Sequence, residues 1–301
     1  MDKISIIVPC YNEEESIPYF YDAIIQVAEE MKEQEFEFIF IDDGSKDKTL
    51  PILRDLHQKD KRVRYVSFSR NFGKEAGMYA GLSKSTGDFV AIMDVDLQDP
   101  PSLLPEMYKT LKEEDYDSVA TRRSTREGEP KVRSFFARRF YEIINAISDA
   151  DIVSGARDYR LMKRVMVDAI LSMSEYNRFS KGIFGWVGFK TKWLSYENIE
   201  RVAGVTKWSF WKLFKYAIDG IVAFSTVPLL LPLICGVLLF AIGFIFWLVH
   251  LFTHAGSTLL DAIVMIAGVQ LVCLGVVAEY LAKTYTEVLK RPVYIEAEEE
   301  E

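Results

Sequence analysis

The stretch Phe89-Val90-Ala91-Ile92-Met93-Asp94-Val95-Asp96 decides how this chain of 301 residues is interpreted. A short apolar run bounded by polar residues is typical of a fully buried strand, and here two acids follow it directly. Mg²⁺ and Mn²⁺ take oxygen ligands and are usually held by one or two carboxylates together with the phosphates of a substrate. The pattern therefore indicates a divalent-metal site at Asp94 and Asp96, with an ordinary surface turn as the alternative.

Residues 1–200 alternate short apolar runs with amphipathic segments. This alternation predicts an α/β fold with a mostly parallel sheet and helices on both of its faces. In such sheets ligands bind beyond the carboxyl ends of the strands, where acids of this chain also fall. The predicted strands are 4–8, 36–41, 63–68, 89–93 and 118–121, and the predicted helices are 17–31, 48–57 and 74–83.

The C-terminal part of the chain is strongly apolar. Residues 220–260 contain no Asp, Glu, Lys or Arg, and the run 229–251 exceeds the roughly 20 residues that cross a bilayer. A second run, 262–278, completes a predicted two-helix hairpin. Both flanks of the hairpin are basic and its loop is not, which predicts that both termini face the cytoplasm. Before it, residues 205–218 mix aromatic residues with lysines, as in helices that lie in the membrane interface.

Charge and cysteine content add two expectations. The formal net charge of −8 comes largely from the end of the chain, where Glu296 and residues 298–301 are glutamates. We interpret this run as a solvated, disordered tail. Three cysteines without close partners or metal-site spacing predict a reducing compartment, and the first residues show no cleavable signal peptide.

Four segments occur in an order and spacing that is specific to one family. They are Val8-Pro9-Cys10-Tyr11-Asn12-Glu13-Glu14, Asp42-Asp43-Gly44-Ser45, Arg70-Asn71-Phe72-Gly73-Lys74 and Asp94-Val95-Asp96-Leu97-Gln98-Asp99-Pro100. With them the chain resembles the family 2 glycosyltransferases of the GT-A fold, and most closely the polyprenyl-phosphate glycosyltransferases, the group of dolichol-phosphate mannose synthase and the bactoprenol glucosyltransferases. The resemblance implies a Rossmann-like GT-A catalytic domain (1–200), a juxtamembrane amphipathic segment (201–225), two transmembrane helices (226–285) and an acidic cytoplasmic tail (286–301).

The resemblance also implies which residues bind the donor sugar nucleotide. Positions that contact the nucleoside correspond here to Pro9, Tyr11, Glu13, Asp42 and Asp43. Turn chemistry is the alternative for Pro9 and Tyr11, and a cap of helix 48–57 is the alternative for Asp43. Positions for the metal and the diphosphate correspond to Asp94, Asp96 and Gln98, so Mg²⁺ or Mn²⁺ is the expected cofactor, and Asp96 is counted among the catalytic residues.

Basic residues are candidates for the phosphate groups of both substrates. Residues 121–139 are rich in arginine, which suits anionic lipid headgroups, with a solvated face as the alternative. Arg122 matches a family position that contacts phosphate and is expected to act on the donor and in catalysis. By the same resemblance we expect Arg201 and Lys207 to bind the donor, and the acceptor phosphate to be bound by Arg126, Arg133 and Arg178.

Asp158 lies in a segment, Asp158-Tyr159-Arg160-Leu161-Met162, that in bacterial members of the family places its acid near the acceptor. There it is discussed as a catalytic base. A phosphate monoester has a second pKa near ~6, so the acceptor oxygen is already largely ionised at neutral pH. Asp158 is therefore expected to act as a base or to orient an arginine or the acceptor, with a helix-start cap as the alternative.

Taken together, these features predict inverting, metal-dependent transfer of one hexose from a nucleotide diphosphate sugar to polyprenyl (undecaprenyl) phosphate at the cytoplasmic face of the inner membrane. Glucose or N-acetylglucosamine is the expected sugar and UDP rather than GDP the expected nucleotide; a homo-oligomer is compatible with the resemblance, and no nucleic acid is expected. One alternative is a processive polysaccharide synthase, although the Gln-X-X-Arg-Trp motif of that class is absent. The other is a catalytically degenerate membrane scaffold.

Overall fold

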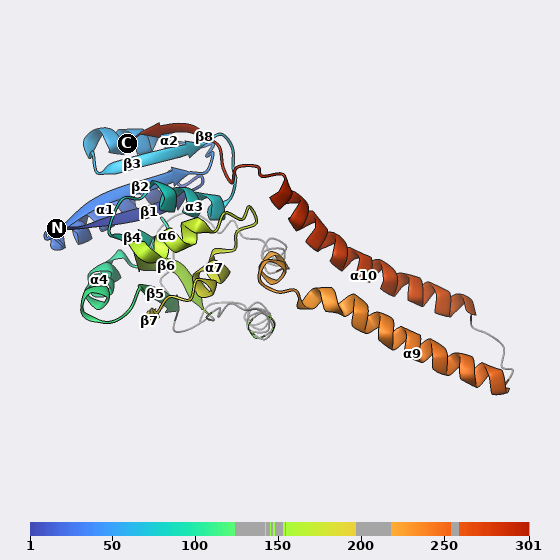
Figure 1. The fold of residues 1–301 in the computed structure, drawn as a ribbon. Helices are drawn as coiled ribbons and strands as arrows, with labels where there is room; N and C mark the ends of the chain where they lie inside the picture. The colour runs from blue at the N-terminus through green and yellow to red at the C-terminus, as the bar shows by residue number, and fades with distance from the viewer. Residues whose placement is uncertain are drawn as a thin grey trace.

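A computed structural model of the chain describes residues 1–123, 155–196, 218–253 and 259–300, with positions 142, 145, 147 and 153 in addition. An α/β body carries a pair of long helices that project from one side (Figure 1). Both ends of the chain lie on the α/β body, so the polypeptide leaves it through the first long helix and returns through the second (Figure 1).

The body is built on one mixed sheet with the strand order β7-β5-β6-β4-β1-β2-β3-β8. The pairs β1–β2, β1–β4, β2–β3 and β5–β7 are parallel, whereas β6 is antiparallel to both of its neighbours and β8 is antiparallel to β3. The strands are β1 (Asp2–Cys10), β2 (Gln34–Asp42), β3 (Val63–Phe68), β4 (Phe89–Ile92), β5 (Ser118–Arg123), β6 (Ala156–Lys163), β7 (Thr191–Tyr196) and β8 (Glu296–Glu300).

Helices cover both faces of this sheet, because side chains at alternate positions of the central strands are buried on opposite sides. Ile4 and Ile6 of β1 pack with α1, α2 and α4, while Ile7 on the other face packs with α3, α6 and α7. The helices of the body are α1 (Ser16–Glu30), α2 (Thr49–Lys59), α3 (Lys74–Lys84), the 3-10 turn η1 (Pro101–Leu103), α4 (Leu104–Glu113), α6 (Arg164–Ser172) and α7 (Ser180–Trp186).

The α/β fold expected from the sequence is confirmed. All five predicted strands and all three predicted helices are present, with ends shifted by a few residues at most. Three strands, β6, β7 and β8, were not predicted. Since Asp158 lies inside β6, the alternative that it caps the start of a helix is wrong.

The acidic C-terminal end is not the solvated, disordered tail that its charge suggested. Residues Glu296–Glu300 form β8, which pairs with β3 and is itself the edge strand of the sheet. Glu298 accepts hydrogen bonds from Tyr65 (2.6 Å) and Arg54, and Lys84 lies 2.6 Å from Glu299. Cations and a phenol on the body thus compensate the repulsion between neighbouring glutamates, so the backbone can take a strand geometry.

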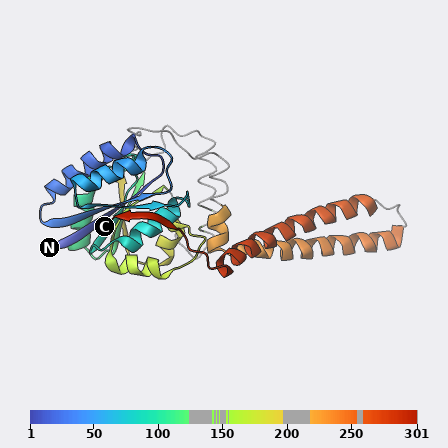
Figure 2. The same cartoon turned by 90° about the horizontal axis from the view of Figure 1, so that it is seen from above.

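The two projecting helices are α9 (Leu230–Thr253), preceded by the 3-10 turn η2 (Val227–Leu229), and α10 (Leu259–Val288). They lie side by side in both views, as the predicted hairpin requires (Figures 1 and 2). Within the described residues, one helix, Ile266–Val288, is long and apolar enough to cross a membrane, and the bent pair Ile218–Phe224 and Val227–Leu239 makes a second span if counted as one. Of the predicted interfacial segment 205–218, only Ile218 is among the described residues.

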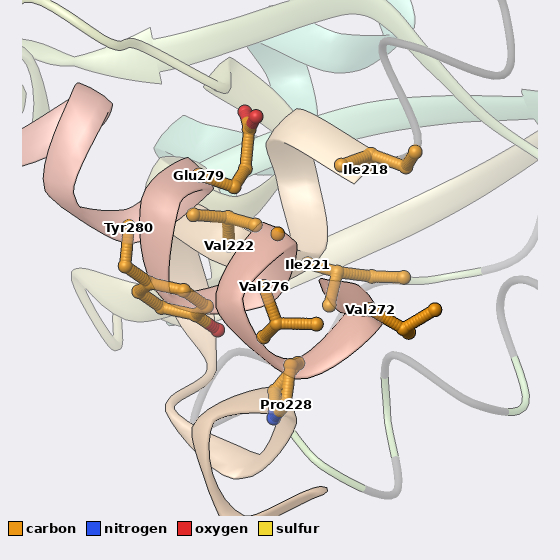
Figure 3. A pocket seen from close by; sticks show the side chains of 9 residues that line it. Ile218, Ile221, Val222, Pro228, Val272, Val276, Glu279 and Tyr280 are labelled. Atoms are coloured by element: carbon orange, nitrogen blue, oxygen red, sulfur yellow. The ribbon is translucent and has the colours of Figure 1, made fainter. Parts of the chain in front are cut away.

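An apolar pocket of about 440 Å³ lies at the base of the hairpin. Figure 3 shows side chains from α10 and from the short helix 218–224 around it. Phe224 of that helix meets the α/β body, since the centroid of its ring lies 6.1 Å from that of Phe179. The pocket is lined by Ile218, Ile221, Val222, Pro228, Val272, Gly275, Val276, Glu279 and Tyr280.

Candidate active site

The predicted site residues meet at one edge of the sheet because of strand direction. Strands β1, β2 and β4 are parallel and end at this edge. Strand β6 runs the other way, so it begins there. Ile92 is paired with Arg160, and continuing this register by two residues brings Asp94 opposite Asp158.

The first two motifs are held together by hydrogen bonds between their loops. The backbone N–H of Asn12 donates to Ser45 Oγ (2.8 Å), and the Asn12 side chain accepts from the N–H of Lys46 (2.8 Å). The N–H of Glu13 donates to Thr49 Oγ1 (2.8 Å). Asn12 has a φ of 52°, a left-handed conformation that asparagine tolerates better than most residues.

Asp42, at the end of β2, is buried, and each of its carboxylate oxygens accepts a hydrogen bond. Its carboxylate accepts from the N–H of Ser45 (3.0 Å) and from Ser67 Oγ of β3 (2.7 Å). Of the other predicted nucleoside contacts, Pro9, Tyr11 and Glu13 are partly exposed at the end of β1 or just after it. All four therefore lie at the same edge of the sheet.

Asp43 joins the second motif to the third. Its two carboxylate oxygens accept from the N–H groups of Phe72 (2.6 Å) and Gly73 (2.9 Å). Burial raises the pKa of Asp43 to about 6, although these N–H groups act in the opposite direction. The alternative that Asp43 caps helix α2 has no support here, since Asp47 is the residue that accepts from the N–H of Thr49 (3.0 Å).

Gly44 explains why the turn after Asp43 needs glycine. Its φ is +65°, and a Cβ atom at this position would lie 2.4 Å from the backbone carbon of Arg70. Any other residue would push the loop of the second motif away from the loop of the third. The close approach keeps Asp43 within reach of its two N–H partners.

Lys74, at the first position of α3, connects the two acids that the sheet register brings together. Its Nζ lies 2.6 Å from Asp94 Oδ1 and 2.5 Å from Asp158 Oδ2. Burial opposes the charge of Lys74, but Asp158 and Asp94 raise its pKa above the usual range. Burial would also raise the pKa of Asp158, yet Lys74, Lys181 and Arg157 hold that pKa well below its usual range. Asp158 is therefore an ionised carboxylate at neutral pH.

The residues at the end of β4 fit a metal that shares its ligands with a substrate. Asp96 is 6% exposed and accepts from the N–H of Gln98 (3.1 Å). The described residues contain no group of three or more His, Cys, Asp or Glu side chains that could hold an ion. A cation at Asp94 and Asp96 would therefore need oxygens from phosphate groups, which is the usual arrangement for Mg²⁺. The ammonium group of Lys74 beside Asp94 shows that this position favours positive charge.

A second ion pair, between Arg157 and Asp99, joins the start of β6 to the segment after β4. Arg157 donates to both oxygens of Asp99 (2.9 and 3.1 Å), and the hydroxyl of Tyr196 donates to the same carboxylate. Asp99 is 1% exposed. This bidentate pair fixes the start of β6 against the segment after β4, and thus the residue next to Asp158.

Two of the predicted basic residues, Arg122 and Arg178, are among the described residues. Arg122 lies near the end of β5, is exposed, and donates to Ser195 Oγ (2.9 Å). Arg178 is buried, donates to the carbonyl of Met173 (2.5 Å), and lies over the ring of Tyr79 at 4.4 Å. The predicted positions Arg126, Arg133, Arg201 and Lys207 lie outside the described residues.

The sequence analysis assigns no role to Lys74, Arg157 or Lys181. Lys74 belongs to the third family motif, and its place after Gly73 at the start of a predicted helix is the signal that could have identified it. Arg157 and Lys181 carried no such signal, because they reach the site only through the antiparallel course of β6 and the position of α7.

Comparisons with known proteins identify relatives over 97% of the chain. The family model for Glycosyl transferase family 2 matches residues 5–171, and that for the GtrB C-terminal hairpin matches residues 227–284. A prophage bactoprenol glucosyl transferase homolog of Escherichia coli (strain K12) is 41% identical, over 97% of this chain and 98% of its own length. The SfII prophage-derived bactoprenol glucosyl transferase of Shigella flexneri is 40% identical, over 97% of both chains.

Among solved structures, mannosyl-3-phosphoglycerate synthase from Rubrobacter xylanophilus has a similar fold. The TM-score is 0.52 at 17% sequence identity, over 73% of this chain and 72% of that one. At this level of identity the similarity concerns the fold alone. Together with the family match, it confirms the GT-A fold of the α/β body.

Proposed function

Since the chain belongs to glycosyl transferase family 2, in its polyprenyl-phosphate group, and is a glycosyltransferase, we propose that it transfers one glucose residue from a nucleotide diphosphate sugar to a polyprenyl phosphate. The observation that carries this proposal is the junction of the four motif loops at one sheet edge, closed by the Asp94–Lys74–Asp158 contact. The names of the bactoprenol glucosyl transferase relatives favour glucose over N-acetylglucosamine.

The donor occupies the ends of β1, β2 and β4 in this proposal. Pro9, Tyr11, Glu13, Asp42 and Asp43 surround the nucleoside, and a UDP sugar remains the preferred donor. Asp94 and Asp96, with Gln98 beside them, would hold a Mg²⁺ or Mn²⁺ ion. When bound, the cation neutralises the negative charge that grows on the departing nucleotide diphosphate. The proposed donor-binding residues also include Arg122, Arg201 and Lys207.

The acceptor approaches from the side of β6 and α7. Its phosphate oxygen forms a bond to the anomeric carbon as the bond from that carbon to the nucleotide diphosphate breaks, so the configuration inverts. The acceptor oxygen needs no strong base, because a phosphate monoester is already largely ionised at neutral pH. The low pKa of Asp158 supports an orienting role rather than proton abstraction. Arg126, Arg133 and Arg178 are the proposed contacts of the acceptor phosphate.

The pocket at the base of the hairpin suits the first isoprene units of the acceptor. Its lining is mostly apolar, and Gly182 of α7 lies against Phe224 of the short helix beside it. Lys181, the neighbour of Gly182, adds positive charge near Asp158. One short helix, α7, therefore connects the apolar pocket to the charged end of β6, as a phosphate with an apolar chain requires.

Purified full-length protein in lipid vesicles tests the proposal. It is incubated with a panel of labelled nucleotide sugars and undecaprenyl phosphate, and the lipid product is separated by chromatography. We expect one sugar per lipid, with the UDP-glucose reaction fastest. Products longer than one sugar would favour the processive synthase, and no product from any donor would favour the scaffold.

The pocket is tested separately by filling it. Val276→Trp is expected to raise the KM for undecaprenyl phosphate and to leave the affinity for UDP unchanged. Val272→Trp addresses the same pocket from one turn away, whereas Val249→Trp on an exposed face of α9 is the matched control. An unchanged KM in both pocket variants would contradict this place for the lipid chain.

Membrane association follows from the matched hairpin, and the proposed topology places the body and both termini on the cytoplasmic side. Single cysteines at exposed Glu35 or within the hairpin loop, each introduced into a variant that lacks the three native cysteines, test this in sealed cells. Labelling of the loop, but not of position 35, by an impermeant thiol reagent is expected. The reverse pattern would overturn the orientation.

A further inference from the structure

The contact between Lys74 and Asp94 conflicts with the metal site unless Lys74 moves. Asp94 Oδ1, an oxygen that the proposed cation would use, lies 2.6 Å from the ammonium group. A divalent cation bound at this oxygen would meet a like charge at close range. One of the two cations must therefore yield when the other occupies Asp94.

Lys74 has a second carboxylate to which it can remain bound. Its Nζ also lies 2.5 Å from Asp158 Oδ2, on the opposite strand. The Lys74 side chain is 31% exposed and that of Asp94 is 22% exposed, so a ligand can reach the contact. The flexible four-carbon stem of lysine allows the ammonium group to give up one partner and keep the other.

We propose that Lys74 is a placeholder cation, whose ammonium group occupies the metal position at Asp94 until a divalent cation arrives together with the nucleotide diphosphate. This inference rests on the metal site of the proposed function. Metal alone binds weakly, because it must displace Lys74 with only Asp94 and Asp96 as carboxylate ligands. The diphosphate adds oxygens and negative charge, so metal and donor enter together.

The placeholder has a consequence for the order of events. While Lys74 bridges Asp94 and Asp158, the donor end of β4 and the acceptor end of β6 are held together without substrate. Once the metal takes Asp94, Lys74 stays with Asp158 alone. The charge of Asp158 thus remains compensated throughout, which keeps this acid in its orienting role.

Binding of Mn²⁺ alone, without nucleotide, tests the placeholder directly. Free Mn²⁺ is measured by electron paramagnetic resonance in titrations of the full-length protein in detergent. Lys74→Met is expected to bind Mn²⁺ about tenfold more tightly than the unchanged protein, since a like charge is removed from beside the site. Lys74→Gln is a second variant with a polar side chain, and the thermal unfolding of each variant reports on folding.

Two control variants separate a direct contact from a general charge effect. Lys181→Met removes a positive charge that acts on Asp158, and it is expected to change Mn²⁺ affinity much less. Lys74→Arg keeps the charge and is expected to keep metal binding weak. In an Asp94→Asn background, the gain from Lys74→Met is expected to disappear.

The outcomes distinguish the placeholder from the proposed function. If Asp94→Asn leaves Mn²⁺ affinity unchanged, the metal site and the placeholder both fail. If Asp94→Asn weakens binding but Lys74→Met and Lys74→Gln do not tighten it, the metal site stands and the placeholder is overturned. An equal gain in Lys181→Met also overturns it.

Discussion

Glu37 lies in the first half of β2 and Asp43 directly follows the other end of this strand. Both carboxylates are buried, but they have different partners. Glu37 and Asp43 are 4% and 3% exposed. Glu37 accepts from Ser5 Oγ (2.5 Å) and the N–H of Thr86 (2.7 Å) and lies 2.9 Å from Lys3. Asp43, just beyond the other end, accepts from two backbone N–H groups.

The pKa values of these acids diverge accordingly. Burial alone would raise both. At Glu37 the hydrogen bonds and Lys3 outweigh burial and lower the pKa to about 2, whereas at Asp43 burial wins and raises the pKa to about 6. At Glu37 a lysine and several hydrogen bonds compensate the buried charge, whereas at Asp43 two backbone N–H groups do so only in part. A carboxyl whose pKa is raised by burial in this way is typical of a functional site.

Removal of either acid of the proposed metal site is expected to have the largest effect on activity, and a small effect would contradict the assignment of this end of the sheet as the functional one. Asp94→Ala and Asp96→Ala should each lower the rate of lipid glucosylation at least about 10³-fold, because charge on the leaving group loses its stabilisation. The initial rate of product formation in vesicles measures this. Asp168→Ala, at an exposed position of α6, should keep the full rate.

Glu37 tests the structural end of the sheet. Glu37→Ala removes the carboxylate that accepts from Ser5 and from the N–H of Thr86 and that pairs with Lys3, so it should lower the free energy of unfolding by about 2–3 kcal/mol. Unfolding in urea, followed by circular dichroism, measures the loss, and exposed Glu35→Ala is the matched control. A loss of activity without a loss of stability would show that this end is also functional.

The pH dependence of the same acid has a defined sign. Because the pKa of Glu37 is lowered in the folded protein, its contribution to stability is present above its unfolded pKa near 4.5 and is lost as the pH falls toward about 2. Glu37→Gln should remove that part of the acid sensitivity, which urea unfolding at a series of pH values measures.

Asp43 should respond to pH in the opposite sense. Its raised pKa means that it takes up a proton as the pH falls through about 6. A protonated carboxyl loses one acceptor for Phe72 or Gly73, so the loop of the third motif loosens and donor affinity should fall about tenfold. Measurements of UDP affinity between pH 5 and 7.5 test this. The change in affinity should follow the uptake of one proton per molecule of protein.

Two observations would show that this pH effect arises from Asp43. Asp43→Asn should bind UDP weakly at every pH, without the step near 6. Stability should not fall in the same range through this group, because a raised pKa means that the folded state binds the proton more tightly than the unfolded chain. A step that persists in Asp43→Asn would assign it to another residue.

The smallest expected effect concerns Tyr294, in the C-terminal segment just before β8. Tyr294 stacks on Phe68 of β3 with ring centroids 4.8 Å apart. Tyr294→Ala should lower the free energy of unfolding by on the order of 1 kcal/mol and weaken UDP binding only slightly. Exposed Glu300→Ala is the control, and equal effects of both substitutions would show that the C-terminal segment acts through its charge instead.

Prediction from sequence worked where structure is local. The strands at 4–8, 36–41, 63–68 and 89–93 could be predicted because each is a run of consecutive apolar residues, which is the pattern of a buried strand. It failed at residues 296–300, where five residues rich in glutamate form a strand only because Arg54, Tyr65 and Lys84 lie opposite. Such compensation comes from distant segments and leaves no local pattern.

The same division holds for the site. The acids at the ends of β1, β2 and β4 were found in the sequence, because parallel strands with known ends must gather them at one edge. The partners of these acids were not found. Asp43 with Phe72 and Lys74 with Asp158 are separated by 29 and 84 positions, and no spacing rule connects them.

By itself the sequence determined the α/β fold, the acidic strand ends, the apolar hairpin and the family, since these depend on short-range patterns and on motifs in a fixed order. The tertiary structure alone decided that β6 is antiparallel to β4, and the continued register of this pair brings Asp158 opposite Asp94. It also decided that one lysine is shared between them. The physical reason is that charge compensation is a property of atoms close in space, whatever their separation along the chain.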